Sequence, residues 1–394
     1  MAKVLEKQIQ TFKLTEDEKL LRKTIREVSE ENFKEKAREI DKSHRFPREN
    51  FDLLASLGIT GLTLPEEYGG GGMNYISYAI VIEEIARVCA ATSVMLAVHL
   101  SLSSIPIYKF GSQFIRDKYV RKLAKGELMG AFCLSEPGNG SDAAAMLTRA
   151  DDKGDHCILN GTKAWITNGS QADLYLVIAQ TNPELKHKGV TAFIVEKNMS
   201  GVSFGKLEDK LGIRASATCQ VILDNVQVPK ENILGNVGDG FKIAMMTLDS
   251  GRIGIAAQGL GIAQASYDLA SSYAKTREAF GKKIITFQAL QFMLVEIATE
   301  IEAGRLLTYQ AANMYDQGLK FTRQSAEAKL FCSELATKAS NKAIQILGGY
   351  GYTTEYDAER FYRDAKITEI YEGTSEIHRI VIAQNIIKEL GDRT

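Results

Sequence analysis

The chain has 394 residues, of which 45% are hydrophobic and 25% charged, as in an ordinary globular protein of two or three domains. Its 48 lysines and arginines nearly balance its 49 aspartates and glutamates, and the formal net charge is −1. No basic field is present to hold a nucleic-acid backbone, so nucleic-acid binding is not expected.

Cysteine spacing and apolar run length exclude further classes. The five cysteines are widely spaced and form no CxxC pair or Cys/His cluster, so we expect reduced, buried cysteines and no metal site. Uninterrupted apolar runs are shorter than the ~20 residues of a membrane span, which predicts no membrane insertion. Acidic and basic residues alternate from Glu16 to Glu49, unlike a signal or transit peptide, and a cytoplasmic location is expected.

The N-terminal third is predicted to be helical. Thr15 and Glu18 have the spacing of a capping box at a helix N-terminus. Pro47 is expected in the first turn of a second helix, which Gly58 would end. The four glycines at 69–72 are expected to form a plain loop between helices, because no strand precedes them and no phosphate-binding lysine follows.

The pattern of apolar residues changes at about residue 130. Residues 190–195 and 219–223 are β-branched or aromatic runs of strand length. Asn160-Gly161 lies between two shorter runs and predicts a hairpin turn, because both residues tolerate positive φ. No helix-length segment separates these strands, which favours an antiparallel barrel or sandwich.

After Gly235 the pattern is helical again. Apolar residues recur at spacings of three and four in residues 290–301 and 328–339, and no proline follows Pro229. Several of these helices are long enough to form a bundle. We therefore expect an α+β protein of three domains. These are an N-terminal helical domain of residues 1–127, a middle β domain of residues 128–234 and a C-terminal helical bundle of residues 235–394.

Two stretches of the middle segment could hold a ligand. Residues 131–142 begin as a strand and end in a glycine-rich turn that could aim backbone N–H groups and the hydroxyls of Ser135 and Ser141 at an acceptor-rich ligand. A purely structural turn is an equally good interpretation. Trp165, the only tryptophan, could stack on a planar cofactor at a strand end, although a position in the core is the commoner role.

Glu372 lies at a junction between two predicted helices. Gly373 interrupts a helical pattern and Thr374 can cap the helix that follows. A carboxylate at such a junction can point into a cleft, where desolvation would raise its pKa and make it a stronger base toward a carbon acid. A solvated glutamate at a helix end is the simpler alternative.

These motifs together resemble the acyl-CoA dehydrogenase family along nearly the whole chain, and its short-chain (butyryl-CoA) members most closely. The resemblance implies that family's fold, in which an antiparallel β domain lies between an N-terminal helical domain and a C-terminal four-helix bundle. It is carried by Ala131–Asp142, Trp165-Ile166-Thr167, Leu248–Arg252, Arg277 with Phe280-Gly281, Gln345–Gly349 and Tyr371–Glu376.

The resemblance implies FAD as the cofactor. The residues that match the family's flavin contacts are Phe132, Leu134, Ser135, Ser141, Trp165, Ile166, Thr167, Arg277, Phe280, Gln288, Gln345, Gly348, Gly349, Thr374 and Glu376. Those that match contacts to the FAD of a neighbouring subunit are Arg277, Gln288, Gln345 and Gly349. A homo-oligomer, usually a tetramer in this family, is therefore implied.

The implied reaction is α,β-dehydrogenation of a short-chain acyl-CoA to the 2-enoyl-CoA. Glu372 would remove the α-proton while the β-hydrogen leaves as hydride to flavin N5, and an electron-transfer flavoprotein would take the electrons. Other branches of the family place the base at the position of Gly251, which leaves Glu372 as the candidate here. The residues that match substrate contacts are Ser141, Asp249, Arg252, Gln258, Thr368, Tyr371 and Gly373.

A short, uncharged acyl chain is expected. Gln258 and Thr368 match positions that narrow the acyl pocket in short-chain members, and no Lys or Arg lies between Val88 and Ile105 to hold a distal carboxylate. A branched or cyclic acyl group, reoxidation by O₂, a catalytically inactive scaffold and a protein without cofactor are the alternatives. A mature enzyme of the mitochondrial matrix would show the same absence of a targeting signal.

Overall fold

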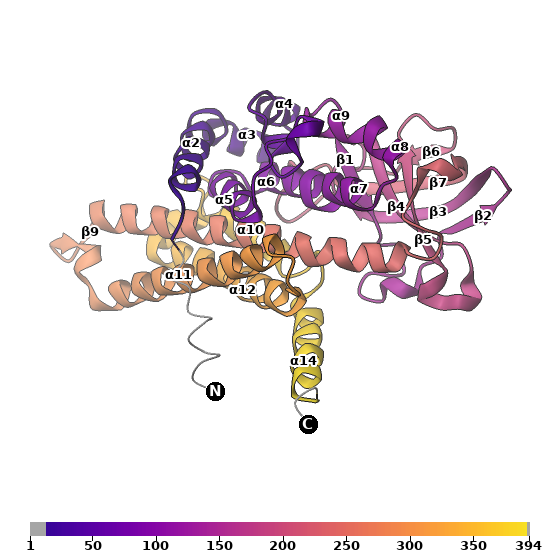
Figure 1. Cartoon of the computed structure of the whole chain (residues 1–394). Coiled ribbons are helices and arrows are strands. Elements are labelled where there is room, and N and C mark those ends of the chain that lie inside the picture. Colours follow the sequence, from indigo (N-terminus) through magenta and orange to yellow (C-terminus); the bar gives the residue numbers. More distant parts are fainter. Residues whose placement is uncertain (1–12, 392–394) are drawn as a thin grey trace.

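The computed structural model describes residues 13–391, so the outermost ends of the first and third predicted domains lie outside the described residues. Figure 1 shows the N-terminal helices on one side of the long helix α10 (Gly240–Thr276) and helices α11 and α12 on the other. A β-sheet lies at one end of α10. The order along the chain is therefore helical, β and helical, as the residue patterns predict.

The N-terminal segment consists of short helices. Their bounds are α2 (Glu16–Asn32), α3 (Lys34–Ser43), α4 (Arg48–Ser56), α5 (Tyr75–Ala86), α6 (Ala90–Ala97), α7 (Ile105–Phe110), α8 (Gln113–Ile115) and α9 (Arg121–Ala124).

The predicted capping box and the helix stop near Gly58 are confirmed, but Pro47 is the N-cap of its helix and not part of the first turn. The Thr15 hydroxyl accepts from the Glu18 backbone N–H at 3.2 Å, and the Glu18 carboxylate accepts from the Thr15 N–H at 2.9 Å. Helix α4 follows Pro47, and Gly58 just beyond it has a left-handed φ of 74°. The glycines at 69–72 lie in irregular chain between helices.

One apolar segment is longer than the uninterrupted runs of the sequence indicated. Helices α6 and α7 join through π-helical turns at Val98–Ser104, and the combined segment Ala90–Phe110 is long and apolar enough to cross a membrane. Its apolar window is completely buried inside the protein, against α10 and the first strand of the sheet. A buried core helix can have the same length and composition as a membrane span, so this segment by itself is weak evidence for one.

The sheet has eight strands in the order β6-β7-β3-β2-β4-β5-β8, with β1 paired to β4. Their bounds are β1 (Gly130–Cys133), β2 (Arg149–Asp152), β3 (His156–Ile166), β4 (Leu174–Gln180), β5 (Val190–Glu196), β6 (Val202–Phe204), β7 (Cys219–Pro229) and β8 (Ile233–Leu234).

Most neighbouring strands are antiparallel, as expected, but two pairings are parallel and make the sheet a mixed one. Strand β1 pairs with β4 in parallel, and β2 also meets β4 in parallel. The chain between β1 and β4 is long enough to return and run in the same direction, as parallel pairing requires. The β2–β3 hairpin occupies part of this connection, so no helical crossover is needed.

The predicted hairpin turn at Asn160-Gly161 is also wrong. Both residues lie inside the continuous strand β3, where the register against β7 shifts between Leu159 and Gly161. Gly161 has φ 153°, and a Cβ there would lie 2.4 Å from the Thr148 hydroxyl. Glycine therefore serves an irregularity and a close approach inside the sheet, which produce the same local signal as a turn.

The C-terminal segment is a helical bundle, as predicted. Besides α10 it contains α11 (Gln288–Asp316), α12 (Thr322–Leu347), α13 (Ala358–Thr368) and α14 (Ser375–Gly391). A small hairpin of β9 (Glu278–Ala279) and β10 (Lys282–Lys283) lies between α10 and α11. Helix α12 packs against α10, α11, α13 and α14. All five cysteines are buried and free, as expected.

Helix α10 approaches α5 closely enough that we expect Gly261→Ala to destabilise the protein. A Cβ at Gly261 would lie 2.3 Å from the Glu83 carbonyl oxygen and 2.6 Å from the Ala86 Cβ. Alanine ordinarily favours a helix by about 1 kcal/mol over glycine, whereas this overlap should lower the free energy of unfolding by about 1–3 kcal/mol. Chemical denaturation measures the change, with the exposed Ser272→Ala on the same helix as control. A Gly261→Ala protein as stable as wild type would contradict this packing.

Candidate active site

Glu372 lies in the turn between α13 and α14, where the backbone is unusual. Its φ is 53°, and the next residue, Gly373, has φ 102°. Positive φ at a residue other than glycine is a strained conformation that recurs at functional sites. Thr374 caps α14 as predicted, since its hydroxyl accepts from the Ile377 N–H at 3.3 Å.

The Glu372 side chain points at α10. An ideal Cβ at Gly251 would lie 2.3 Å from Glu372 Oε2, so the missing side chain at position 251 makes room for this carboxylate. Glu372 Oε2 is buried and has no hydrogen-bond partner among residues 13–391. Burial raises the pKa of Glu372 to about 7, against the opposing charges of Lys329 and Arg252. The solvated glutamate considered as an alternative is therefore not what the structure shows.

Other buried polar atoms around Glu372 also lack protein partners. Within the described part of the chain they include Arg252 Nε and the Ser375 hydroxyl. Buried polar groups are normally hydrogen-bonded, so unpaired ones around a carboxylate indicate a place for a ligand or water.

Asp249 and Arg252 pair with each other. Their side chains are 2.6 Å apart, and Asp249 also accepts from the Thr322 hydroxyl at 2.7 Å. Arg252 is buried, and its charge acts on the Glu372 carboxylate. Its guanidinium therefore lies inside the protein near Glu372 and not at the surface.

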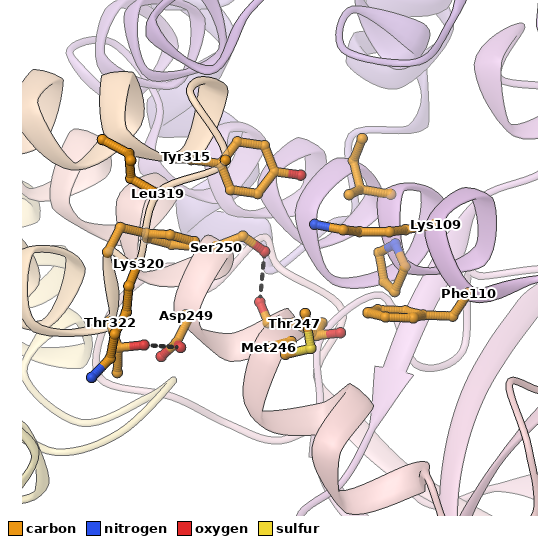
Figure 2. A pocket seen from close by; sticks show the side chains of 14 residues that line it. Lys109, Phe110, Met246, Thr247, Asp249, Ser250, Tyr315, Leu319, Lys320 and Thr322 are labelled. Carbon is orange, nitrogen blue, oxygen red and sulfur yellow. Dashed lines mark hydrogen bonds between the residues drawn. The ribbon is translucent and has the colours of Figure 1, made fainter.

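A cavity of about 340 Å³ lies beside α10 (Figure 2). Asp249 and Ser250, the residues just before Gly251, form part of its wall. Figure 2 shows Lys109 and Lys320 on opposite sides of it, so the wall carries positive charge. Sequence reasoning missed both lysines because neither belongs to a motif.

Gln258 and Tyr371 are in contact, as expected for residues of one pocket. Tyr371 donates its hydroxyl hydrogen to the Gln258 side-chain oxygen, while the Gln258 amide donates to the Ala90 carbonyl at 2.9 Å. Thr368 is buried, and its hydroxyl donates to the Ala365 carbonyl at 2.7 Å within the same helix.

Trp165 is 62% exposed at the end of β3 and has φ 61°, so its interpretation as a core residue is wrong. Ile166 beside it is buried, and Thr167 is half-buried. In the neighbouring glycine-rich stretch, Phe132 and Leu134 are buried, Ser135 is half-buried and Ser141 is exposed.

A buried ion pair that sequence reasoning missed holds this glycine-rich stretch. Lys163 Nζ, on β3, lies 2.8 Å from a Glu136 carboxylate oxygen and donates to the Leu134 carbonyl at 3.0 Å. Glu136 also accepts from the backbone N–H groups of Leu147 and Thr148. Lys163 is fully buried. Because Lys163 and Glu136 together bind residues at both ends of the glycine-rich stretch, the stretch is tied to the sheet.

A second group of predicted flavin residues lies around the β9–β10 hairpin. Arg277, Gly348 and Gly349 line a cavity of about 500 Å³, and Phe280 nearby is 93% exposed. Gln288 begins α11 and Gln345 lies in the last turn of α12, while Glu376 is exposed on α14. Figure 1 shows this hairpin at one end of the long helices and the sheet at the other, so one chain does not bring Arg277 to Trp165.

Comparison with known proteins agrees with this arrangement. Three family models match in order: the acyl-CoA dehydrogenase N-terminal domain over residues 15–127, the middle domain over 131–226 and the C-terminal domain over 238–387. In residues 13–391, no group of three or more His, Cys, Asp or Glu side chains could hold a metal ion.

Individual proteins similar to this chain include named acyl-CoA dehydrogenases. The chain is 50% identical to the mitochondrial short-chain specific acyl-CoA dehydrogenase of Rattus norvegicus, over 96% of this chain and 92% of that one. The structure of butyryl-CoA dehydrogenase from Megasphaera elsdenii superposes with a TM-score of 0.94 at 42% identity, covering 96% of this chain and all (100%) of that one. A chain in the structure described as the electron transferring flavoprotein of Acidaminococcus fermentans gives 0.94 at 46% identity, covering 96% and 99%. With all three domain models matched in order and near-complete coverage of these relatives, the chain belongs to the acyl-CoA dehydrogenase family.

Proposed function

We propose that the protein is an FAD-dependent enzyme that oxidises a short-chain acyl-CoA to the 2-enoyl-CoA, with Glu372 as the catalytic base. The observation that carries this proposal is the buried Glu372 Oε2, which faces the space left by Gly251 and has no partner in residues 13–391. A carboxylate with a pKa of about 7 is ionised in a large fraction of molecules at neutral pH and is a stronger base than a solvated one.

Glu372 takes the α-proton of the thioester substrate onto its free carboxylate oxygen. FAD, held by the residues named below, would supply the acceptor for the hydrogen that leaves the β-carbon as hydride. The Glu372 backbone N–H donates no hydrogen bond within residues 13–391. It is therefore free to donate to the thioester carbonyl as negative charge develops there. A preorganised donor of this kind is typically responsible for about 2.7–4 kcal/mol of transition-state stabilisation.

The residues at the end of the sheet fit a flavin. The exposed ring of Trp165 offers a flat apolar face, and the stretch tied down by Lys163 and Glu136 offers backbone and hydroxyl groups beside it. The residues that would hold the ring system here are Phe132, Leu134, Ser135, Ser141, Trp165, Ile166 and Thr167, with Thr374 and Glu376 toward the adenosine side.

We propose that a second subunit completes this site. Arg277 offers paired donors suited to a pyrophosphate, and the backbone of Gly348 and Gly349 lies in the same cavity. These groups are at the opposite end of the molecule from Trp165, so they would serve the FAD of a neighbouring chain, together with Phe280, Gln288 and Gln345. The protein would then be a homo-oligomer, and a tetramer is our proposal.

The substrate would enter through the cavity of Figure 2. Lys109 and Lys320 supply positive charge for the anionic CoA, beside Asp249. The Gln258–Tyr371 contact fills the space near Glu372 and would limit the acyl chain, with Thr368 in the same wall. The names of the rat and M. elsdenii relatives support a chain of about four carbons, and Ser141 and Gly373 would contact its thioester end.

Redox partner, domain division and location complete the proposal. The similarity to a chain in the A. fermentans structure supports an electron-transfer flavoprotein as electron acceptor. The domains would meet near residues 127 and 234, where α9 gives way to β1 and β8 to α10. A cytoplasmic location is proposed, with the mitochondrial compartment named for the rat relative as the alternative.

Glu372→Gln tests the base directly. The variant should retain FAD, because position 372 is not needed to bind it, but the rate of flavin bleaching by butyryl-CoA under anaerobic conditions should fall about 10²–10⁴-fold. Stopped-flow absorbance measures the rate, and Glu334→Gln, an exposed change on α12, is the matched control. Bleaching at nearly the wild-type rate in Glu372→Gln would refute the assignment of the base.

Arg277→Ala tests the shared flavin site. Loss of a charge-assisted contact to phosphate typically costs about 1.5–3 kcal/mol, so FAD should bind about 10–150-fold more weakly, with loss of the assembled form where FAD links subunits. Equilibrium dialysis and light scattering measure the two effects, and the exposed Lys275→Ala on α10 is the control. Unchanged FAD affinity and molecular mass would count against an intersubunit role.

A further inference from the structure

Lys329, on α12, is a buried lysine to which the proposed mechanism gives no task. None of its side chain is exposed (0%), and its Nζ donates to the Gly373 carbonyl oxygen at 2.6 Å. No carboxylate in the described part of the chain lies within ion-pair distance of it. A buried cation without an ion partner is costly, so this arrangement requires a compensating interaction.

The contact lies at the strained turn that carries the base. Glu372 and Gly373 both have positive φ, and this pair reverses the chain between α13 and α14. Within the turn, the Ser375 N–H donates to the Glu369 carbonyl at 3.0 Å. Three side chains of α12 bind the turn from outside: Lys329 donates to the Gly373 carbonyl, Ser333 to the Thr368 carbonyl at 2.8 Å and Thr337 to the Glu369 carboxylate. Of these three, Lys329 binds at the Glu372–Gly373 pair itself, so it fixes this pair against α12.

The charges near the Glu372 carboxylate are few. Arg252 on α10 is a cation, but Asp249 at 2.6 Å offsets much of its charge. His378 on α14 remains neutral, because burial and the two nearby cations lower its pKa to about 2. Tyr78 on α5 and Tyr371 within the turn are neutral phenols, since burial raises the pKa of each.

Of the two cations near the Glu372 carboxylate, Lys329 is therefore the one whose charge is not neutralised by an ion pair with another residue. Burial lowers its own pKa to about 7, while Glu372 favours its charged form and Arg252 disfavours it. Glu369 and Glu376 also favour the charged form of Lys329, from beyond ion-pair distance. The lysine and the base thus titrate in the same pH range, each influencing the other.

We propose that Lys329 is a positioning residue for the base: its ammonium anchors the Glu372–Gly373 turn through the Gly373 carbonyl and favours the ionised form of the Glu372 carboxylate. This inference rests on the proposed role of Glu372. It assigns Lys329 no contact with the substrate or with FAD, and its effect on the reaction passes entirely through Glu372.

The pH dependence of anaerobic flavin bleaching by butyryl-CoA tests the proposal in Lys329→Met and Lys329→Gln. Removal of the positive charge should raise the pKa of Glu372, so the acid limb of the profile should move up by about one pH unit. Bleaching should then be about tenfold slower at pH 6, and the difference should narrow above pH 8, where wild-type Lys329 itself is neutral. Lys329→Gln keeps a donor for the Gly373 carbonyl and should retain more of the rate at high pH than Lys329→Met.

Lys338→Met is the matched control, since it removes an exposed lysine from the same helix and should leave the profile unchanged. FAD content and thermal unfolding report whether each protein is folded. An acid limb at the wild-type pH in both Lys329 variants would overturn the proposal, and so would an equal loss of rate at every pH. Failure of Lys329→Gln to fold would also overturn it, because the proposal requires the amide to replace the anchor.

The outcomes separate this inference from the proposed function. If butyryl-CoA does not bleach the wild-type flavin at any pH, the proposed function fails. If it bleaches wild type but not Glu372→Gln, while the Lys329 variants keep the wild-type profile, the function stands and only the role of Lys329 is refuted.

Discussion

The burial of one carboxylate is the constraint on which the rest of this structure depends. In its proposed role, Glu372 must lose its water to become a base of suitable strength, yet it must still ionise near neutral pH. The protein meets both requirements by placing Oε2 against Gly251, without a hydrogen-bond partner in residues 13–391, and by surrounding it with a paired arginine and a lysine. A side chain at position 251 would occupy the space that the carboxylate needs.

Helix α10 makes this placement possible because every part of the fold packs against it. It contacts α5 and α6 of the N-terminal segment, β4 and β5 of the sheet, and α11, α12 and α13 of the bundle. Glycines along α10 allow these close approaches, as at Gly261 against α5. The same helix supplies Asp249 and Ser250 to the cavity, Arg252 to the carboxylate and Gln258 to the contact with Tyr371, so its position sets the spacing among these groups.

Local signals in the sequence predicted the helical, β and helical order and the junction at Glu372. They failed at Asn160-Gly161, because tolerance of positive φ is needed in a strand irregularity as well as in a turn. The contacts of Lys163 and Lys329 could not be predicted, since their partners lie 27 to 44 residues away and a lysine without a motif resembles any surface lysine. Motif resemblance identified the candidate base, while its surroundings emerged only from the packing of α10, α12 and α14.

The most direct test of the account is the wild-type pH profile of flavin reduction. Rapid mixing of the FAD-loaded protein with butyryl-CoA under anaerobic conditions, from pH 5.5 to 9, measures the chemical step without an electron acceptor. The account predicts that bleaching accelerates with rising pH through an apparent pKa near 7, as Glu372 becomes ionised. A rate that does not change with pH across this range would show that no buried carboxylate of this kind takes the proton, and would contradict the account.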